Sequence, residues 1–125
     1  MTAKSWGDER LYLHHMLERC QRIGRLIAPG KLHFDESEGL QDGVIRNIEV
    51  IGEAAKHVSP ATRALLPAVN WRAVCGMRDV LIHGYADVDI EEVWLVASNR
   101  VPDLLKVLEH FLSLDAPEPS HRPPY

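Results

Sequence analysis

The densest group of reactive side chains in this 125-residue chain lies in one short stretch. Arg78 and His83 are five positions apart and Tyr85 follows, which gives the pattern RxxxxHxY. An arginine offers a permanently charged fork that suits a phosphate, and a histidine titrates near pH ~6.5. Together they provide for cleavage of RNA without a metal or other cofactor, in which the ribose 2′-OH attacks its own phosphorus. The spacing alone decides little, because such pairs are frequent on amphipathic helices.

The motif is expected to lie on one helix. At ~100° per residue, Arg78 and Tyr85 then fall nearly on one line and Asp79 and His83 on another. Asp79 stands four residues before His83, so its carboxylate is expected to hold the imidazole in one tautomer and to favour the protonated form. We expect the two polar lines to border one groove.

Apolar residues recur at three-or-four spacing through most of the chain, which predicts helices. Asp35 or Ser37 is expected to cap the second long helix, and Asp89, with Glu92, the last one, in which Pro102 predicts a kink. The predicted segments run from Asp8 to Ala28, Glu38 to Val58, Ser59 to Leu66 (a short turn or helix), about Asn70 through the motif, and Asp89 to Leu112. No alternating strand pattern intervenes. The fold class is therefore all-α, an up-and-down bundle of four main helical segments plus a short connecting helix.

Length and composition indicate one domain with a real core, since 46% of the residues are hydrophobic. We expect a lead over residues 1–7, a helical domain over 8–112 and a disordered Pro-rich tail over 113–125. Cys20 and Cys75 form no CxxC pair and are interpreted as packing residues. Without a signal peptide or an apolar run of membrane length, a cytoplasmic location is expected. The net charge of −4 means that any RNA contact must be local.

Small residues on the second long helix, Gly52, Ala54 and Ala55, are expected to let another helix approach closely. Because the apolar arc of this helix is wider than one core contact needs, a homodimer is favoured, with a large monomeric core as the alternative.

Other candidate sites are interpreted conservatively. His14 and His15 point about 100° apart on a helix and are predicted to be surface residues rather than metal ligands. Trp71 and Trp94 are assigned to packing rather than to base stacking. The nearest further positive charges that could guide RNA are Arg46, Arg63 and Arg72. The chain has no nucleotidyltransferase carboxylate pattern, so it should not itself transfer nucleotides.

Further stretches accompany the motif and strengthen its interpretation. They are Arg46-Asn47-Ile48-Glu49-Val50-Ile51-Gly52-Glu53-Ala54-Ala55, Pro67, Trp71, Gly76-Met77, Gly84 and Val93-Trp94. With these, the chain resembles the HepT family of HEPN-domain toxins from about Leu11 to Leu112, and the RxxxxHxY motif is complete.

The resemblance implies a homodimeric ribonuclease of a type VII-like toxin–antitoxin system, with the two motifs meeting at the dimer interface and Arg78 and His83 catalytic. By analogy with other two-histidine ribonucleases, we expect one His83 to take the proton of the 2′-OH while the other protonates the leaving 5′ oxygen, with both Arg78 side chains stabilising the phosphorus centre. The implied partner is an MntA-type nucleotidyltransferase antitoxin that transfers AMP to Tyr85. Asn47 and Glu53 are candidates for lining the cleft.

Two other interpretations remain open. The chain could be a non-catalytic HEPN subunit that anchors a nucleotidyltransferase, which its net acidity favours, or a bundle whose motif is only a hydrogen-bonded turn near Gly84. Glu49 and Glu53 could hold a cation or act as acid and base, but ion pairs with Arg46 and Lys56 are the expectation. An intact Arg78–His83 pair favours the ribonuclease, because a scaffold needs no such pair.

Overall fold

The computed structural model describes residues 6–83 and 87–114, with side chains described for residues 9–79 and 88–114. The elements are α1 (Trp6–Ile27), α2 (Lys31–Glu36), α3 (Glu38–Lys56), α4 (Pro60–Ala64), α5 (Trp71–Cys75), α6 (Met77–Leu81), β1 (Ile82–His83), β2 (Asp87–Val88), α7 (Ile90–Leu95), the π-helical η1 (Val96–Arg100) and α8 (Val101–Leu114). The predicted all-α class is confirmed, with one two-residue ladder added. Most of the predicted lead and tail lies outside the described residues.

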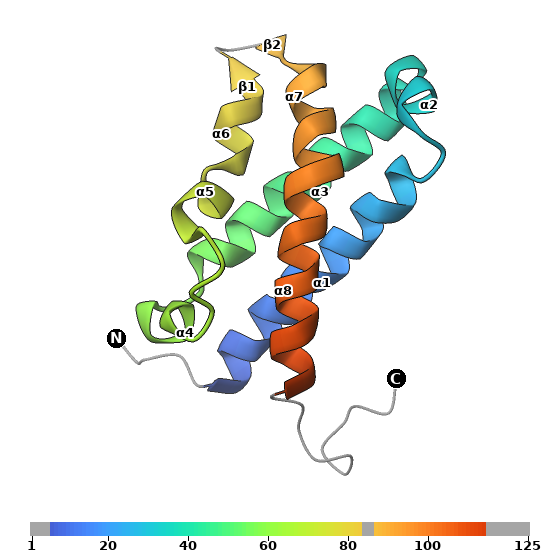
Figure 1. Ribbon diagram of the computed structural model, residues 1–125. Helices are drawn as coiled ribbons and strands as arrows, with labels where there is room; N and C mark the ends of the chain where they lie inside the picture. The colour runs from blue at the N-terminus through green and yellow to red at the C-terminus, as the bar shows by residue number, and fades with distance from the viewer. Residues whose placement is uncertain (1–5, 84–86, 115–125) are drawn as a thin grey trace.

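The long helices alternate in direction. α1 runs up, α3 returns beside it, α5 and α6 run up again, and α7, η1 and α8 descend as one rod (Figure 1). α1 packs against α3 and α8, and α3 also contacts α5 and α6. The side chains at the centre are fully buried and come from every long element: Leu13, Met16, Ile23, Val44, Ile48, Ile51, Val93, Val101 and Leu108. Burial of each such side chain stabilises the fold by about 1.5–3 kcal/mol.

Two predicted helix starts are confirmed by their caps. The Ser37 Oγ atom accepts a hydrogen bond of 3.1 Å from the Leu40 backbone N–H at the start of α3. At the start of α7, Asp89 Oδ1 accepts from the Glu92 N–H at 3.2 Å. Each bond satisfies a backbone donor that the first turn of a helix leaves without a partner.

The short helix α2 was not predicted. Gly30 precedes it with φ of 108°, a left-handed conformation that glycine adopts without steric cost and that reverses the chain after α1. The apolar anchor is Phe34, which is fully buried with its ring centroid 5.4 Å from that of Trp94. Lys31 Nζ lies 2.7 Å from Asp35 and 2.9 Å from Glu91, so α2 is tied to α7 by charge as well.

The small residues of α3 are used inside the protomer. Ala54 and Ala55 are buried in the core. A Cβ atom at Gly52 would lie 3.4 Å from the carbonyl oxygen of Cys75 and 3.5 Å from that of Val74, so α5 already occupies this space. The wide apolar arc of α3 is explained by α1 on one side and by α5 and α6 on the other. The inference of a homodimer from these residues was therefore wrong, although the dimer itself stays a prediction.

The last helical rod is irregular just before Pro102. The Val101 N–H bonds to the Val96 carbonyl five residues earlier, which is the π-helical pattern. Ser98 Oγ donates to the Trp94 carbonyl at 2.7 Å and Asn99 Nδ2 to the Leu95 carbonyl at 3.2 Å. Since Pro102 has no N–H, it cannot continue the ladder of hydrogen bonds. The sequence predicted a kink at Pro102; what the structure has is a π-turn that ends two residues before this proline.

The residues assigned to packing do pack. Cys20 is buried, and burial raises its pKa to about 12, so the thiol stays protonated. Trp71, Trp94 and Cys75 are partly buried against the core. The Trp71 indole N–H donates to the Arg63 carbonyl at 3.2 Å. These predictions are confirmed.

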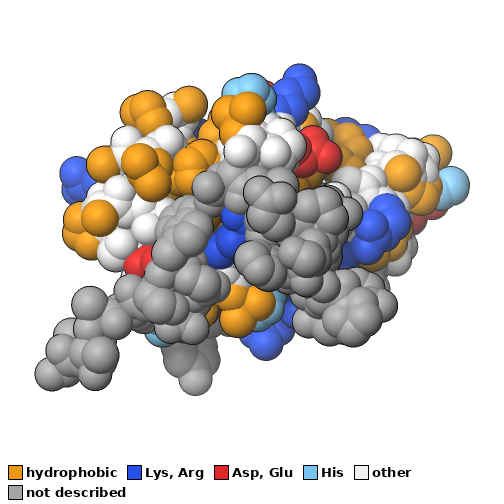
Figure 2. Space-filling model, turned by 90° about the horizontal axis from the view of Figure 1, so that it is seen from below, with side chains coloured by type: hydrophobic (Ala, Val, Ile, Leu, Met, Phe, Trp, Pro, Cys, Tyr) orange, Lys and Arg blue, Asp and Glu red, His pale blue; other side chains and the backbone are white. Residues whose placement is uncertain are grey.

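The surface is mixed in character. At the end where α1 begins and α8 finishes, hydrophobic side chains alternate with Lys and Arg (Figure 2). Leu65 and Leu114 are exposed large hydrophobic residues, and both border an open cavity of about 390 Å³ beside α8. No helix in the described part of the chain combines the length and the apolar content that a membrane span requires.

Candidate functional site

The described part of the motif lies on two elements, α6 and β1, rather than on one helix. α5 finishes at Gly76, whose N–H bonds back to the Arg72 carbonyl at 3.1 Å, and α6 runs only from Met77 to Leu81. His83 lies on β1, which pairs antiparallel with β2 so that Ile82 faces Val88. The expected single helix was wrong. The cause is local, because Gly76 stops one helix and the β-branched Ile82 and Val88 suit a strand pair.

Because α6 ends at Leu81, the side-chain positions expected for a single helix do not apply to the motif. Arg78 lies on α6 and His83 on β1, so Asp79 is not one helical turn before His83. The backbone of His83 pairs with Asp87 in the ladder. The His83 side chain and the whole of Tyr85 lie outside the described residues, so their roles stay predictions.

Arg78 projects from α6 between two carboxylates. Its Nε atom donates to Glu49 Oε2 on α3 at 3.2 Å, and its Nη1 atom lies 3.5 Å from Asp79 Oδ1. The Arg78 side chain is 53% exposed and that of Glu49 31%. Pairs this exposed contribute about 0–1 kcal/mol, so Glu49 orients the guanidinium without locking it. The other N–H groups of the fork remain accessible to a phosphate.

Glu49 is the site residue that the sequence analysis missed. It was expected to pair with its neighbours on the helix, yet its partner Arg78 is 29 residues away. The only sequence signal was its place on the same stretch as Arg46 and Asn47 in the resemblance. That stretch does not reveal which helix crosses which.

The two candidates for lining the cleft between protomers, Asn47 and Glu53, lie on α3, and their role there stays a prediction. Asn47 is buried between α1 and α3, where it accepts from Arg19 Nη1 at 3.2 Å and donates to the Gly43 carbonyl at 2.7 Å. Glu53 is exposed and pairs with Lys56 at 3.3 Å, as the ion-pair interpretation predicted. Within one protomer neither side chain forms a hydrogen bond or an ion pair with Arg78 or Asp79.

Of the three arginines considered as RNA guides, Arg63 is used internally. It donates to the carbonyls of Val58 at 3.0 Å and Ala55 at 2.9 Å, and its guanidinium lies 5.5 Å from the centre of the Trp71 ring. Arg63 therefore caps the end of α3 and is not available to RNA. Arg46 and Arg72 are exposed.

No described group of three or more His, Cys, Asp or Glu side chains is arranged to hold a metal ion. His14 and His15 are both exposed on α1, which confirms their assignment to the surface. The chemistry available at the described motif is that of an oriented guanidinium, with the backbone of a histidine two residues past the end of the same short helix.

An all-α, up-and-down bundle with RxxxxHxY at the end of its third helical segment defines a HEPN-type protein. The model of the ribonuclease HepT-like family matches residues 16–111, and the chain belongs to this family.

Relatives agree with this assignment. The chain is 33% identical over 108 residues to a candidate RNase of Methanocaldococcus jannaschii, covering 84% of this chain and 88% of that protein. It is 41% identical over 64 residues to a probable ribonuclease HepT of Thermococcus cleftensis, covering 51% and 58%. A second M. jannaschii protein, named as a gamma-glutamylcyclotransferase and candidate RNase, is 36% identical over 107 residues, but this chain spans only 48% of its length. No solved structure matches the chain.

Proposed function

We propose that the chain is a metal-independent endoribonuclease and the toxin of a HEPN/nucleotidyltransferase toxin–antitoxin pair. The observation that carries the proposal is the half-exposed Arg78 guanidinium, oriented by Glu49 at 3.2 Å on the short helix that leads into the strand of His83. A guanidinium held in this way is prepared for a charged phosphate before the substrate arrives. Membership of the ribonuclease HepT-like family supports the same reaction class.

In the proposed reaction a base removes the proton of the 2′-OH, and the 2′ oxygen bonds to the adjacent phosphorus. The bond from phosphorus to the 5′ oxygen breaks, and an acid protonates that oxygen as it leaves. His83 of each protomer in a homodimer would serve as base and acid, and Arg78 would stabilise the charge on the phosphorus oxygens. The products are a 2′,3′-cyclic phosphate and a 5′-hydroxyl.

Cleavage of RNA in the presence of EDTA is the test of this activity. The purified chain should cut single-stranded RNA in EDTA and leave DNA of the same sequence intact, because DNA has no 2′-OH. Gel analysis and mass spectrometry should detect the cyclic phosphate. A mock purification from cells lacking the chain controls for contaminating ribonuclease. Absence of cleavage by chain unmodified at Tyr85 would contradict the proposal and favour the non-catalytic binding subunit.

We also propose that an MntA-type antitoxin neutralises the chain by transferring AMP to Tyr85. The tyrosine oxygen would bond to the α-phosphorus of ATP, and pyrophosphate would leave. The added phosphate charge and adenosine, two positions after His83 in the chain, would repel RNA and obstruct the site.

Co-expression with such a transferase should therefore add whole AMP units to the intact mass of the chain and abolish RNA cleavage. Tyr85→Phe should show no added mass and should keep cleaving RNA, whereas Tyr12→Phe, on α1, should be modified like the wild type. Modification of Tyr85→Phe, or an unmodified wild-type chain, would contradict this mode of control.

A further inference from the structure

A groove lies between α5 and α6 on one side and η1 and α8 on the other. It consists of two neighbouring cavities of about 320 and 180 Å³ that share four lining residues, Asn70, Ala73, Met77 and Arg100. The larger volume falls within the range of about 300–1,000 Å³ typical of pockets for small ligands. Met77 is the residue directly before Arg78, so the groove adjoins the motif.

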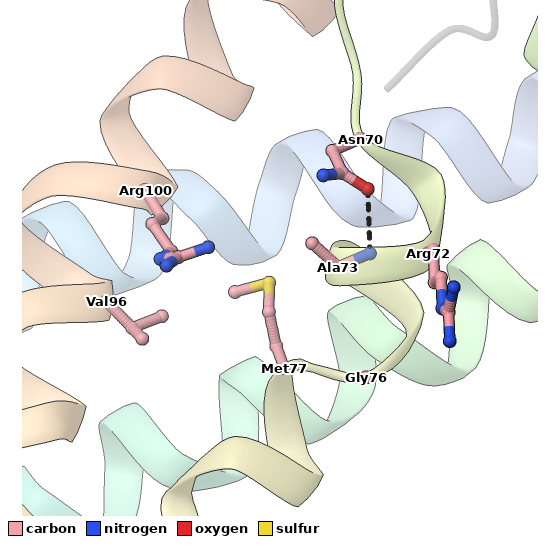
Figure 3. A pocket seen from close by; sticks show the side chains of 7 residues that line it. All are labelled: Asn70, Arg72, Ala73, Gly76, Met77, Val96 and Arg100. Carbon is pink, nitrogen blue, oxygen red and sulfur yellow. Dashed lines mark hydrogen bonds between the residues drawn. The ribbon is translucent and has the colours of Figure 1, made fainter.

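The floor of the groove is apolar and its rim is polar. Met77 and Val96 are buried, and the side chains of Met77, Val96 and Arg100 point toward one another, with the amide of Asn70 nearby (Figure 3). Arg72 also borders the larger cavity, but its side chain lies on the opposite side of α5 (Figure 3). The space at the centre is therefore bounded by a thioether, aliphatic groups and one guanidinium.

The polar groups at the larger cavity are hydrogen-bond donors. Arg100 is exposed and its guanidinium has no hydrogen-bond or ion-pair partner within the described part of the chain. Asn70 uses its Oδ1 atom to accept from the Ala73 N–H at 3.0 Å, which leaves its NH₂ group for a ligand. Asp103 borders only the smaller cavity. Donors without carboxylates at the larger cavity favour a ligand that is anionic and rich in acceptors.

The π-turn contributes both Val96 and Arg100 to this groove. π-turns inside α-helices are frequent at functional sites, because the extra residue redirects side chains at the expense of regular hydrogen bonds. Here the turn is stabilised by the Ser98 and Asn99 side chains. Packing of the core does not account for an exposed arginine at its last position.

We propose that this groove binds a nucleotide of single-stranded RNA beside the cleaved bond. Its base would lie against Met77 and Val96 beneath the Arg100 guanidinium, which also contacts a phosphate, and the Asn70 NH₂ would donate to a base carbonyl. Unpaired bases are recognised by stacking on planar groups, including arginine, together with contacts to their edges. An NH₂ donor that contacts a base carbonyl selects against adenine, the one base without a carbonyl group.

The position next to the cleaved bond rests on the proposed function. Met77 and Arg78 are consecutive on α6 and point about 100° apart, so one strand passing around this helix can reach both the groove and Arg78. The groove also supplies a positive charge for RNA binding by a chain that is acidic overall. Arg78 is flanked by two carboxylates and the net charge is −4, so RNA binding needs a further cation that is free of such partners, and Arg100 is one.

Binding is tested separately from cleavage. The probe is a short, fluorescein-labelled single-stranded RNA with every 2′-OH methylated, and its anisotropy is followed at several KCl concentrations. Arg100→Ala removes the cation, and Ala73→Leu fills the groove with a good helix former. Each should weaken binding about tenfold. Arg100→Ala should also lower the salt slope by about 1, and Ala73→Leu should not.

Lys106→Ala is the matched control, since Lys106 is a cation of the same rod that borders neither cavity, and it should bind RNA as the wild type does. Thermal melting identifies any variant that fails to fold, and Ala73→Val, with a smaller side chain, then replaces Ala73→Leu.

The outcomes separate the groove from the reaction. If Ala73→Leu binds RNA as tightly as the wild type, the groove does not hold a nucleotide and the proposal is overturned, even where the wild type cleaves RNA. If both variants weaken binding and the wild type cleaves no unmethylated RNA, the groove stands and the ribonuclease activity fails. If the wild type binds no RNA, both fail.

Discussion

Replacement of Arg78 by alanine is expected to lower the rate of RNA cleavage about 10²–10³-fold and to leave the fold intact. The rate falls because a preorganised donor to the charged phosphorus oxygens is lost. The fold persists because Arg78 makes only exposed ion pairs, whose removal changes the free energy of unfolding by about 0–1 kcal/mol. Arg78→Lys should also remain well below the wild type, since an ammonium group cannot form the two-pronged contact with phosphate.

Initial rates on single-stranded RNA in EDTA measure this effect, with thermal melting to verify folding. Arg25→Ala is the control, because Arg25 is an exposed arginine in the last turn of α1 and borders neither cavity of the groove. Its rate should equal that of the wild type. Wild-type rates for Arg78→Ala would remove Arg78 from the catalytic machinery.

A double variant separates the role of Glu49 from that of Arg78. If Glu49 acts by orienting Arg78, Glu49→Gln lowers kcat in the wild-type background and has no further effect once Arg78 is alanine. Equal losses in both backgrounds would instead assign Glu49 a role of its own. The comparison depends on the 3.2 Å contact between α3 and α6.

Phe34→Ala is expected to lower the free energy of unfolding by about 3–5 kcal/mol, the range for removal of a buried aromatic ring. Phe34 is fully buried and meets Trp94 of α7, so its loss leaves a cavity where α2 joins the last helical rod. Leu32→Ala is the matched control on the same helix, because Leu32 is exposed, and it should change stability by less than about 0.5 kcal/mol.

Denaturant unfolding followed by circular dichroism gives both values. A change below about 1 kcal/mol for Phe34→Ala would mean that α2 contributes little to the core and that its contact with Trp94 is not maintained in solution.

The long helices were predictable because their apolar residues repeat over many turns, as Leu13, Met16 and Ile23 do in α1. The short helix α2 was not, because six residues with two apolar side chains carry no period. The same limit applies after Arg78. An apolar run as short as Val80 to Ile82 fits a helix or a strand equally well, and only the pairing of Ile82 with Val88 decides.

For the site, the sequence indicated what is local and missed what is distant. Arg78 and His83 stand out because they are close together in the chain. The Glu49 contact was missed because it depends on how α3 crosses α6. The small residues near Gly52 were assigned to a dimer because a sequence does not tell whether a close helix belongs to the same protomer or to another. Likewise, the groove at Arg100 depends on a π-turn, whereas Pro102 predicted only a kink.

The position of α3 between α1 and the motif has a consequence for mutational tolerance. Asn47 bonds to Arg19 of α1, Glu49 to Arg78 of α6, and Gly52 leaves room only for the backbone of α5. Three sides of α3 therefore make specific contacts with other helices within two helical turns. In a library of single substitutions, this segment should accept fewer replacements than any exposed helical face of the same length, and variants selected for altered RNA preference should accumulate around η1 instead.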